Sequence, residues 1–189
     1  VVQSILDIGP IRYPYFGLML FLAVVTARTK VRLIGGSSLS LLTTIVLLSV
    51  MMLGTNAAIL VAVVGVTVQC AFPRQRFTAH HLAFNMGMIS LIAAMAGAGY
   101  HASKEPFVGA LLASLLYYIG NSVCVSLVVG LATRKSVIRL WHDNFLYTAP
   151  SFFVAGFLAE IVATLASTFP ATVLIVVVPI LYLSYYSYR

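Results

Sequence analysis

The chain has 189 residues, of which 61% are hydrophobic and only 8% are charged, and its mean hydropathy is +1.05. This composition excludes a soluble globular protein, whose surface needs more charged residues, and indicates an integral membrane protein. The formal net charge of +7 would suggest nucleic acid as the partner of a soluble protein. In a membrane protein it indicates contact with the anionic headgroups of a lipid bilayer, so we expect no nucleic-acid partner.

Seven apolar runs follow one another and predict about seven transmembrane helices. In chain order they are Tyr13 to Ala27, Ser38 to Leu53, Asn56 to Phe72, His81 to Tyr100, Phe107 to Leu131, Phe145 to Ser167 and Ala171 to Tyr186. The second and third runs are short, since about 20 helical residues cross a hydrocarbon core of about 30 Å. A locally thinned bilayer or one re-entrant pair are alternatives, so six to eight spans stay open. The expected fold is all-α, a polytopic membrane helical bundle in which residues 1–189 form one domain.

The basic residues predict the orientation of this bundle, because they fall into alternate gaps between the runs. The first gap holds Arg28, Lys30 and Arg32, the third Arg74 and Arg76, the fifth Arg134, Lys135 and Arg139, and Arg189 follows the last run. Cytoplasmic loops are the ones that retain Lys and Arg. The N-terminus is therefore expected outside and the C-terminus inside. The start at Val1 suggests a fragment of a longer protein.

The longest gap predicts a short interfacial helix near residues 136–144. Val137, Leu140 and Trp141 fall on one helical stripe, whereas Arg139 and His142 lie off it. This pattern is typical of a helix that lies on the inner membrane surface, with Trp141 as its anchor.

Small residues predict where the spans pack, because lipid gives helices no hydrophobic reason to associate. They repeat every four residues on three spans: Ala93 and Gly97, Gly109 and Ala113, and Ala155, Ala159 and Ala163. We expect close helix contacts at each of these positions.

Glu160 is the one ionisable side chain deep inside a predicted span, which makes it the first candidate for a ligand-binding residue. Counting about 1.5 Å per residue from the ends of the runs places Glu160 and Asn121 at similar depth. We therefore expect a shared polar site, to which Tyr117, Tyr118 and Ser122 would add hydroxyl groups. The alternative is a protonated Glu160 that only joins two helices.

Two amides nearer the inner end of the bundle are interpreted as structural. Gln69 and Asn85 flank one loop at similar depth and are expected to bind each other across adjacent helices. No metal site and no cofactor are expected, because no carboxylate or Cys clusters with His80 and His81. No enzyme is expected either, since catalytic motifs and acidic residues are too few.

Several short strings, taken in order, resemble the multi-span membrane input region of bacterial HD-GYP, diguanylate cyclase and histidine kinase signalling proteins. They are Lys30-Val31-Arg32-Leu33 with Gly35-Gly36, Val68-Gln69-Cys70, Phe84-Asn85, Tyr118 with Asn121, Trp141, Pro150 with Phe152, Phe153 and Gly156, Pro179-Ile180-Leu181-Tyr182-Leu183, and Ser187-Tyr188-Arg189. The resemblance covers the chain from about Ala27 onward. The short, kinked spans also resemble, at the level of fold, the S components of energy-coupling-factor transporters.

The first resemblance implies a sensory module of the bacterial inner membrane that binds a small ligand or lipid. It would signal to a cytoplasmic output domain that follows residue 189 covalently, with cyclic-di-GMP turnover or phosphotransfer as the output. The second resemblance implies a solute-binding subunit of a vitamin transporter. An accessory subunit of a larger membrane complex is the third alternative, and a homodimer stays open under each.

Overall fold

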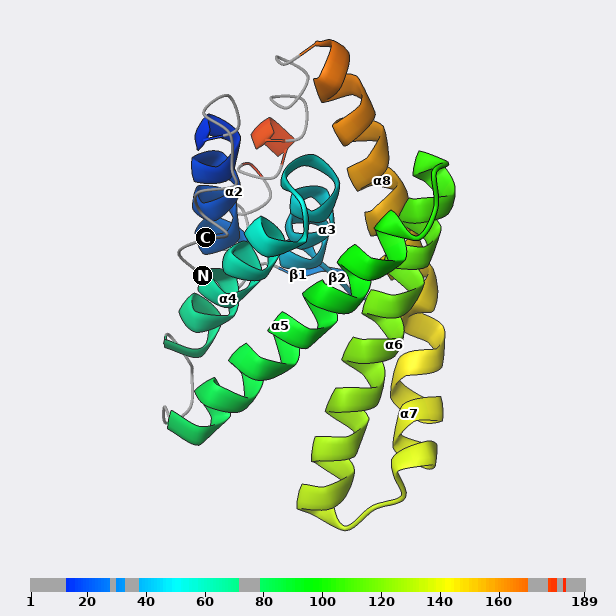
Figure 1. The fold of residues 1–189 in the computed structure, drawn as a ribbon. Helices are drawn as coiled ribbons and strands as arrows, with labels where there is room; N and C mark the ends of the chain where they lie inside the picture. The colour runs from blue at the N-terminus through cyan, green and yellow to red at the C-terminus, as the bar shows by residue number, and fades with distance from the viewer. Residues whose placement is uncertain are drawn as a thin grey trace.

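The computed structural model describes residues 13–27, 30–32, 38–71, 79–169, 177–179 and 182. These residues form an all-α bundle of seven helices with one short two-stranded ribbon (Figure 1). In chain order the elements are α2 (Tyr13–Thr26), β1 (Lys30–Arg32), β2 (Ser38–Ser40), α3 (Leu41–Leu53), α4 (Thr55–Ala71), α5 (Ala79–His101), α6 (Pro106–Thr133), α7 (Val137–Phe145), the 3-10 turn η2 (Leu146–Thr148) and α8 (Ala149–Thr168).

Six of the seven predicted apolar runs coincide with a helix within a few residues. The largest differences are at Ser38–Ser40, which pairs as β2 with β1, and at Phe145, which ends α7. The ribbon is antiparallel, with Val31 opposite Leu39, and it was not predicted from the sequence. The predicted run from Ala171 to Tyr186 lies outside the described residues, apart from 177–179 and 182.

Helix α3 forms the centre of the bundle. Eleven of its thirteen residues are buried, on all sides of the helix. It is enclosed chiefly by α8, α4, α2 and α5. A helix that is hydrophobic all round is expected in such a position. Gly54 then turns the chain into α4 with a φ of 89°, a conformation that suits glycine because it has no Cβ.

Small residues allow the remaining helices to approach closely, as predicted. A Cβ built on Gly97 of α5 would collide with Thr55 at the start of α4. On α8, a Cβ on Gly156 would collide with the hydroxyl of Ser114 on α6. Ala93, Ala113, Ala155 and Ala159 are all buried, which confirms the small-residue stripes as packing surfaces.

Among the described residues, three helical segments are long and apolar enough to cross a membrane: α5, α6, and the continuous stretch Val137–Thr168. Helices α2, α3 and α4 are shorter, at 14, 13 and 17 residues. A 13-residue helix is about 20 Å long, less than a hydrocarbon core of about 30 Å. These three candidate spans among the described residues indicate a multi-pass membrane protein, whereas the count of seven spans stays a prediction.

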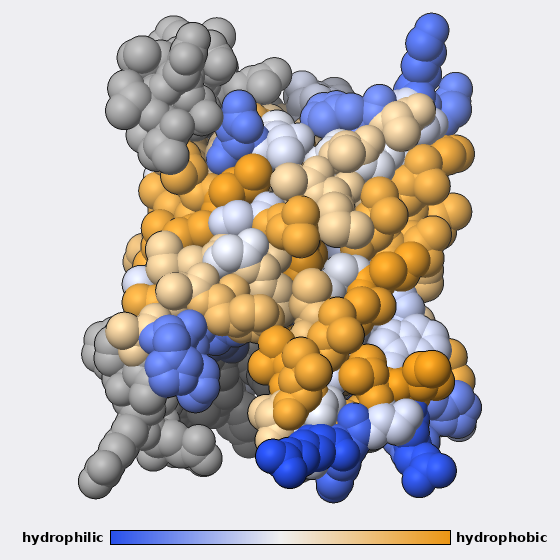
Figure 2. Space-filling model, turned by 60° about the horizontal axis from the view of Figure 1, so that its bottom comes forward, coloured by the Kyte–Doolittle hydropathy of each residue, from blue (hydrophilic) through white to orange (hydrophobic). Residues whose placement is uncertain are grey.

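The long helices expose apolar side chains where a bilayer would meet them. On α6 an exposed side chain recurs every four residues, at Phe107, Leu111, Leu115, Ile119, Val123, Leu127 and Leu131. Figure 2 shows these apolar surfaces as a broad band, with hydrophilic residues gathered at the two ends of the molecule. The distribution fits contact with lipid around the bundle and with water at its ends.

Helix α7 is present where the short amphipathic helix was predicted, but it packs along α6 and continues through η2 into α8 (Figure 1). Gly130 leaves room for Val137 next to the turn of this hairpin. Arg134, Lys135 and Arg139 are exposed around its tip. We call residues 126–145 the α6–α7 hairpin.

Candidate functional site: a cavity at the hairpin base

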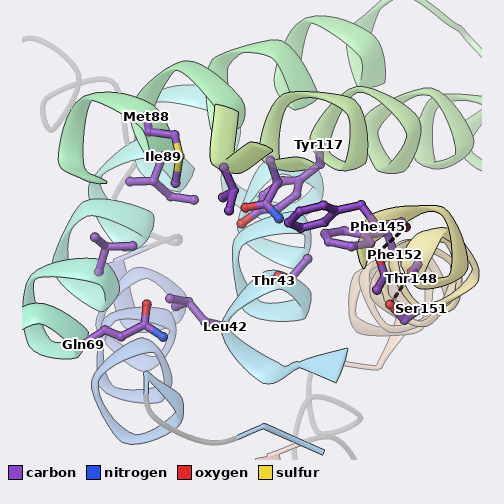
Figure 3. Close-up of a pocket in the computed structure, with 13 residues that line it drawn as sticks. Leu42, Thr43, Gln69, Met88, Ile89, Tyr117, Phe145, Thr148, Ser151 and Phe152 are labelled. Carbon is purple, nitrogen blue, oxygen red and sulfur yellow. Dashed lines mark hydrogen bonds between the residues drawn. The ribbon is translucent and has the colours of Figure 1, made fainter. Parts of the chain in front are cut away.

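A cavity of about 430 Å³ lies between α3, α4, α5, α6 and the junction of α7 with α8 (Figure 3). Its walls are largely apolar. Six polar side chains also line it: Thr43, Gln69, Tyr117, Asn121, Thr148 and Ser151. The lining residues of α3 and α8 lie near the starts of those helices, and Gln69 lies near the end of α4. The cavity is therefore on the side of the bundle that carries the basic hairpin.

One wall of the cavity consists of aromatic rings and hydroxyl groups from α6, η2 and α8. The rings of Tyr117 and Phe152 lie 6.0 Å apart between centroids. The Thr148 hydroxyl donates to the backbone oxygen of Phe145 at 2.7 Å, and the Ser151 hydroxyl donates to that of Thr148 at 2.6 Å. Because these protons are already committed, Thr148 and Ser151 can offer only lone pairs to a ligand.

Two side-chain amides from different helices line the cavity. Gln69 reaches it from α4 and Asn121 from α6. In the described part of the chain, neither side-chain amide has a hydrogen-bond partner. Each amide therefore keeps two N–H donors and one carbonyl acceptor for a ligand or water.

Tyr117 and Asn121 both line the cavity, whereas Tyr118 and Ser122 make other contacts. The Tyr118 hydroxyl donates to the backbone oxygen of Phe145 at 3.3 Å. Ser122 accepts a hydrogen bond of 2.9 Å from the indole of Trp141. Both side chains thus fasten the α6–α7 hairpin and the start of α8, and Trp141 is turned toward α6.

Glu160 does not share the cavity. Its side chain is only 2% exposed, and its Oε1 accepts a hydrogen bond of 3.0 Å from Thr164 on the same helix. Tyr100 of α5 also interacts with this carboxyl group, whereas Oε2 has no hydrogen-bond partner among the described residues. Glu160 is thus a buried polar group between α5 and α8.

The contact between Gly156 and Ser114 explains why the predicted depths were wrong. Helices α6 and α8 are antiparallel. Along the helix axes, Glu160 therefore lies about 6 Å from this contact in one direction, and Asn121 lies about 10 Å from it in the opposite direction. Helix α6 has 28 residues and is about 42 Å long. Counting inward from its end therefore placed Asn121 too near Glu160.

The predicted pair of Gln69 and Asn85 is replaced by a different contact. The Asn85 amide donates to the sulfur of Cys70 at 3.4 Å, and this bond joins α5 to α4. Gln69, one residue before Cys70, turns into the cavity instead. Asn85 thus keeps its predicted structural role, whereas Gln69 is a candidate ligand-binding residue.

The cavity residues of α3, η2 and α8 were not predicted from the sequence; they are Leu42, Thr43, Thr148, Ser151 and Phe152. A signal was present around the start of α8, where the hydroxyl residues Thr148 and Ser151 follow the aromatic residue Phe145 at intervals of three residues. No group of three His, Cys, Asp or Glu side chains that could hold a metal occurs within the described ranges.

Comparison with known proteins does not add a family. No protein-family model, no curated protein and no solved structure matches this chain.

Proposed function

We propose that this protein is a membrane-embedded sensory module that binds a small molecule in the cavity and transmits its presence through the α6–α7 hairpin. Cavities of about 300–1,000 Å³ with a few polar groups are typical of small-molecule sites. The cavity of about 430 Å³ falls in this range. On the cytoplasmic side, an output domain or a partner protein would respond to the change in the hairpin that ligand binding causes.

The orientation is part of this proposal. Arg134, Lys135 and Arg139 of the hairpin face the cytoplasm, whereas Lys104, beside Glu105, faces the outside. The chain crosses the bacterial inner membrane about seven times, with the short helices α2, α3 and α4 in a thinned bilayer or in a re-entrant arrangement.

One observation carries the signalling part of the proposal: Phe145 belongs both to the hairpin and to the cavity wall. Phe145 is the last residue of α7 and lines the cavity. Its backbone oxygen accepts hydrogen bonds from both Tyr118 and Thr148. A ligand that displaces Phe145 or Thr148 must therefore move the junction of α7 and α8. Signalling also requires two arrangements that the ligand binds unequally.

A solute-binding transporter subunit is the second candidate, and the two unpaired amides favour it as well. The cavity, however, lies toward the basic end of the bundle. In the proposed orientation this is the cytoplasmic side, and a subunit that captures a solute from outside would bind nearer the other face. The sensory function is therefore the better supported of the two.

The proposal is tested by filling the cavity and measuring the position of the hairpin. Val125 lines the cavity, whereas Val123 on the same helix is 41% exposed on the lipid face. Spin labels at His80→Cys and Lys135→Cys report the distance from the start of α5 to the hairpin by pulsed electron resonance. Cys70→Ser and Cys124→Ala remove the native thiols.

We expect Val125→Phe to change the distance distribution, because the larger ring must displace the facing wall. The matched control Val123→Phe should leave the distribution unchanged. Identical distributions in both variants, with both proteins folded, would mean that the cavity and the hairpin are not coupled.

A further inference from the structure

The charge of the cavity restricts the ligand that it can bind. Among the described residues that line it, there is no Asp, Glu, Lys, Arg or His. The acidic group buried in the bundle, Glu160, is eight residues beyond Phe152 and is engaged by Thr164. A charged ligand would lose its hydration without gaining an ionic partner, which is unfavourable in a low-dielectric interior. The cavity therefore suits an uncharged molecule.

The hydrogen-bonding groups restrict the ligand further. Gln69 and Asn121 present donors and acceptors from two different helices, and both are free of partners within the described residues. Thr148 and Ser151 add acceptor lone pairs only. An amide is best satisfied by a group that also donates and accepts, as in a carboxamide, a lactam or an imide.

The apolar part of the lining favours a flat ring. Phe145, Tyr117 and Phe152 supply aromatic surfaces on one side (Figure 3). Aromatic pairs prefer offset or edge-to-face contacts, which are available to a bound ring at such a wall. Met88 on the opposite side is an adaptable side chain that fits irregular shapes.

We infer that the cavity binds an uncharged ring compound with a donor–acceptor group of the carboxamide or lactam type, which Gln69 and Asn121 recognise. This inference rests on the proposed function, because it names the ligand class of the same site.

A matched pair of probes tests the inference: naphthalene-2-carboxamide, which is neutral, and naphthalene-2-carboxylate, which has nearly the same shape but a negative charge at neutral pH. Binding of each probe is measured by equilibrium dialysis against the full chain in lipid nanodiscs. Empty nanodiscs give the partition of the probe into lipid, which is subtracted.

We expect saturable binding of the carboxamide and at least tenfold weaker binding of the carboxylate. Asn121→Leu and Gln69→Met, which keep the side-chain size, should each weaken the carboxamide by about tenfold, the loss of one or two hydrogen bonds. The matched control is Asn144→Leu on the exposed face of α7, where the amide donates to the backbone oxygen of Leu140. It should bind the carboxamide as the wild type does.

Equal or tighter binding of the carboxylate than of the carboxamide would overturn the neutral ligand class. If this carboxylate binding depended on Asn121, the proposed function of the cavity would still stand. Carboxamide binding that both amide variants retain would overturn the role of Gln69 and Asn121. Absence of saturable binding of either probe would also overturn the ligand class. The distance measurement with Val125→Phe decides the proposed function separately. If Asn121→Leu fails to fold, Gln69→Met carries the test.

Discussion

The indole N–H of Trp141 on α7 donates a hydrogen bond of 2.9 Å to the hydroxyl of Ser122 on α6. The same Trp141 ring lies 6.4 Å from that of Tyr118, which in turn lies 5.5 Å from the ring of Phe152 in the cavity wall. A chain of contacts thus connects the charged hairpin to the candidate ligand site.

The first prediction concerns this hydrogen bond. Trp141→Phe and Ser122→Ala each remove it, and each should destabilise the hairpin by about 0.6 kcal/mol, with about 1.7 as an upper value for bonds between membrane helices. Unfolding in detergent titrations of the two single variants and the double variant gives the coupling energy. Fully additive effects would show that the two side chains do not interact.

The second prediction concerns the contact between α6 and α8. Gly156→Ala should destabilise the bundle by about 1–3 kcal/mol, because the added methyl group meets the Ser114 hydroxyl. Gly87→Ala on α5 is the matched control, since a Cβ there meets no atom within 4 Å. Combining Gly156→Ala with Ser114→Gly should recover part of the loss. Equal unfolding midpoints for Gly156→Ala and Gly87→Ala would contradict the close approach.

The third prediction separates Glu160 from the cavity. Glu160 and the cavity lie on opposite sides of the contact between Gly156 and Ser114. Glu160→Gln should therefore change carboxamide binding by less than about twofold, whereas Asn121→Leu should weaken it by about tenfold. The glutamine side chain of this variant also keeps an oxygen for the Thr164 hydroxyl. Dialysis of both variants in nanodiscs is the measurement. A tenfold loss in Glu160→Gln would place the carboxyl group in the ligand site after all.

The fourth prediction concerns the lipid face of α6. Ile119 lies at the middle of the helix and is 40% exposed, so Ile119→Arg should cost about 2.5–3.5 kcal/mol of insertion free energy. Leu131→Arg is the matched control, because an arginine near the end of α6 can extend to the headgroups. The membrane-inserted fraction of each variant is measured. Equal insertion of the two would mean that this face does not meet the hydrocarbon core.

The sequence predicts several helix boundaries well because the residues at those boundaries favour the start or the end of a helix. Gly54 stands between α3 and α4, and Pro106 opens α6. The small residues at positions 97, 113, 155 and 159 also predict contacts correctly, since only such side chains allow close packing. Local chemistry is sufficient for both inferences.

The shared site of Glu160 and Asn121 could not be predicted, because depth along a helix depends on the register between neighbours. That register is set by the contact of Gly156 with Ser114, and it places Glu160 beside Tyr100. The direction of the Gln69 side chain likewise depends on a tertiary contact, because the Asn85 amide donates its hydrogen bond to Cys70 and not to Gln69. Neither tertiary choice leaves a pattern in the sequence.

The most direct test of the account is the side of the membrane on which the hairpin lies. In a chain with Cys70→Ser and Cys124→Ala, single cysteines at Lys104 and Lys135 are treated in intact cells with a maleimide that does not cross membranes. We predict labelling of Lys104→Cys in intact cells, and of Lys135→Cys only after the membrane is permeabilised. Labelling of Lys135→Cys in intact cells, with Lys104→Cys protected, would contradict a hairpin that signals to the cytoplasm.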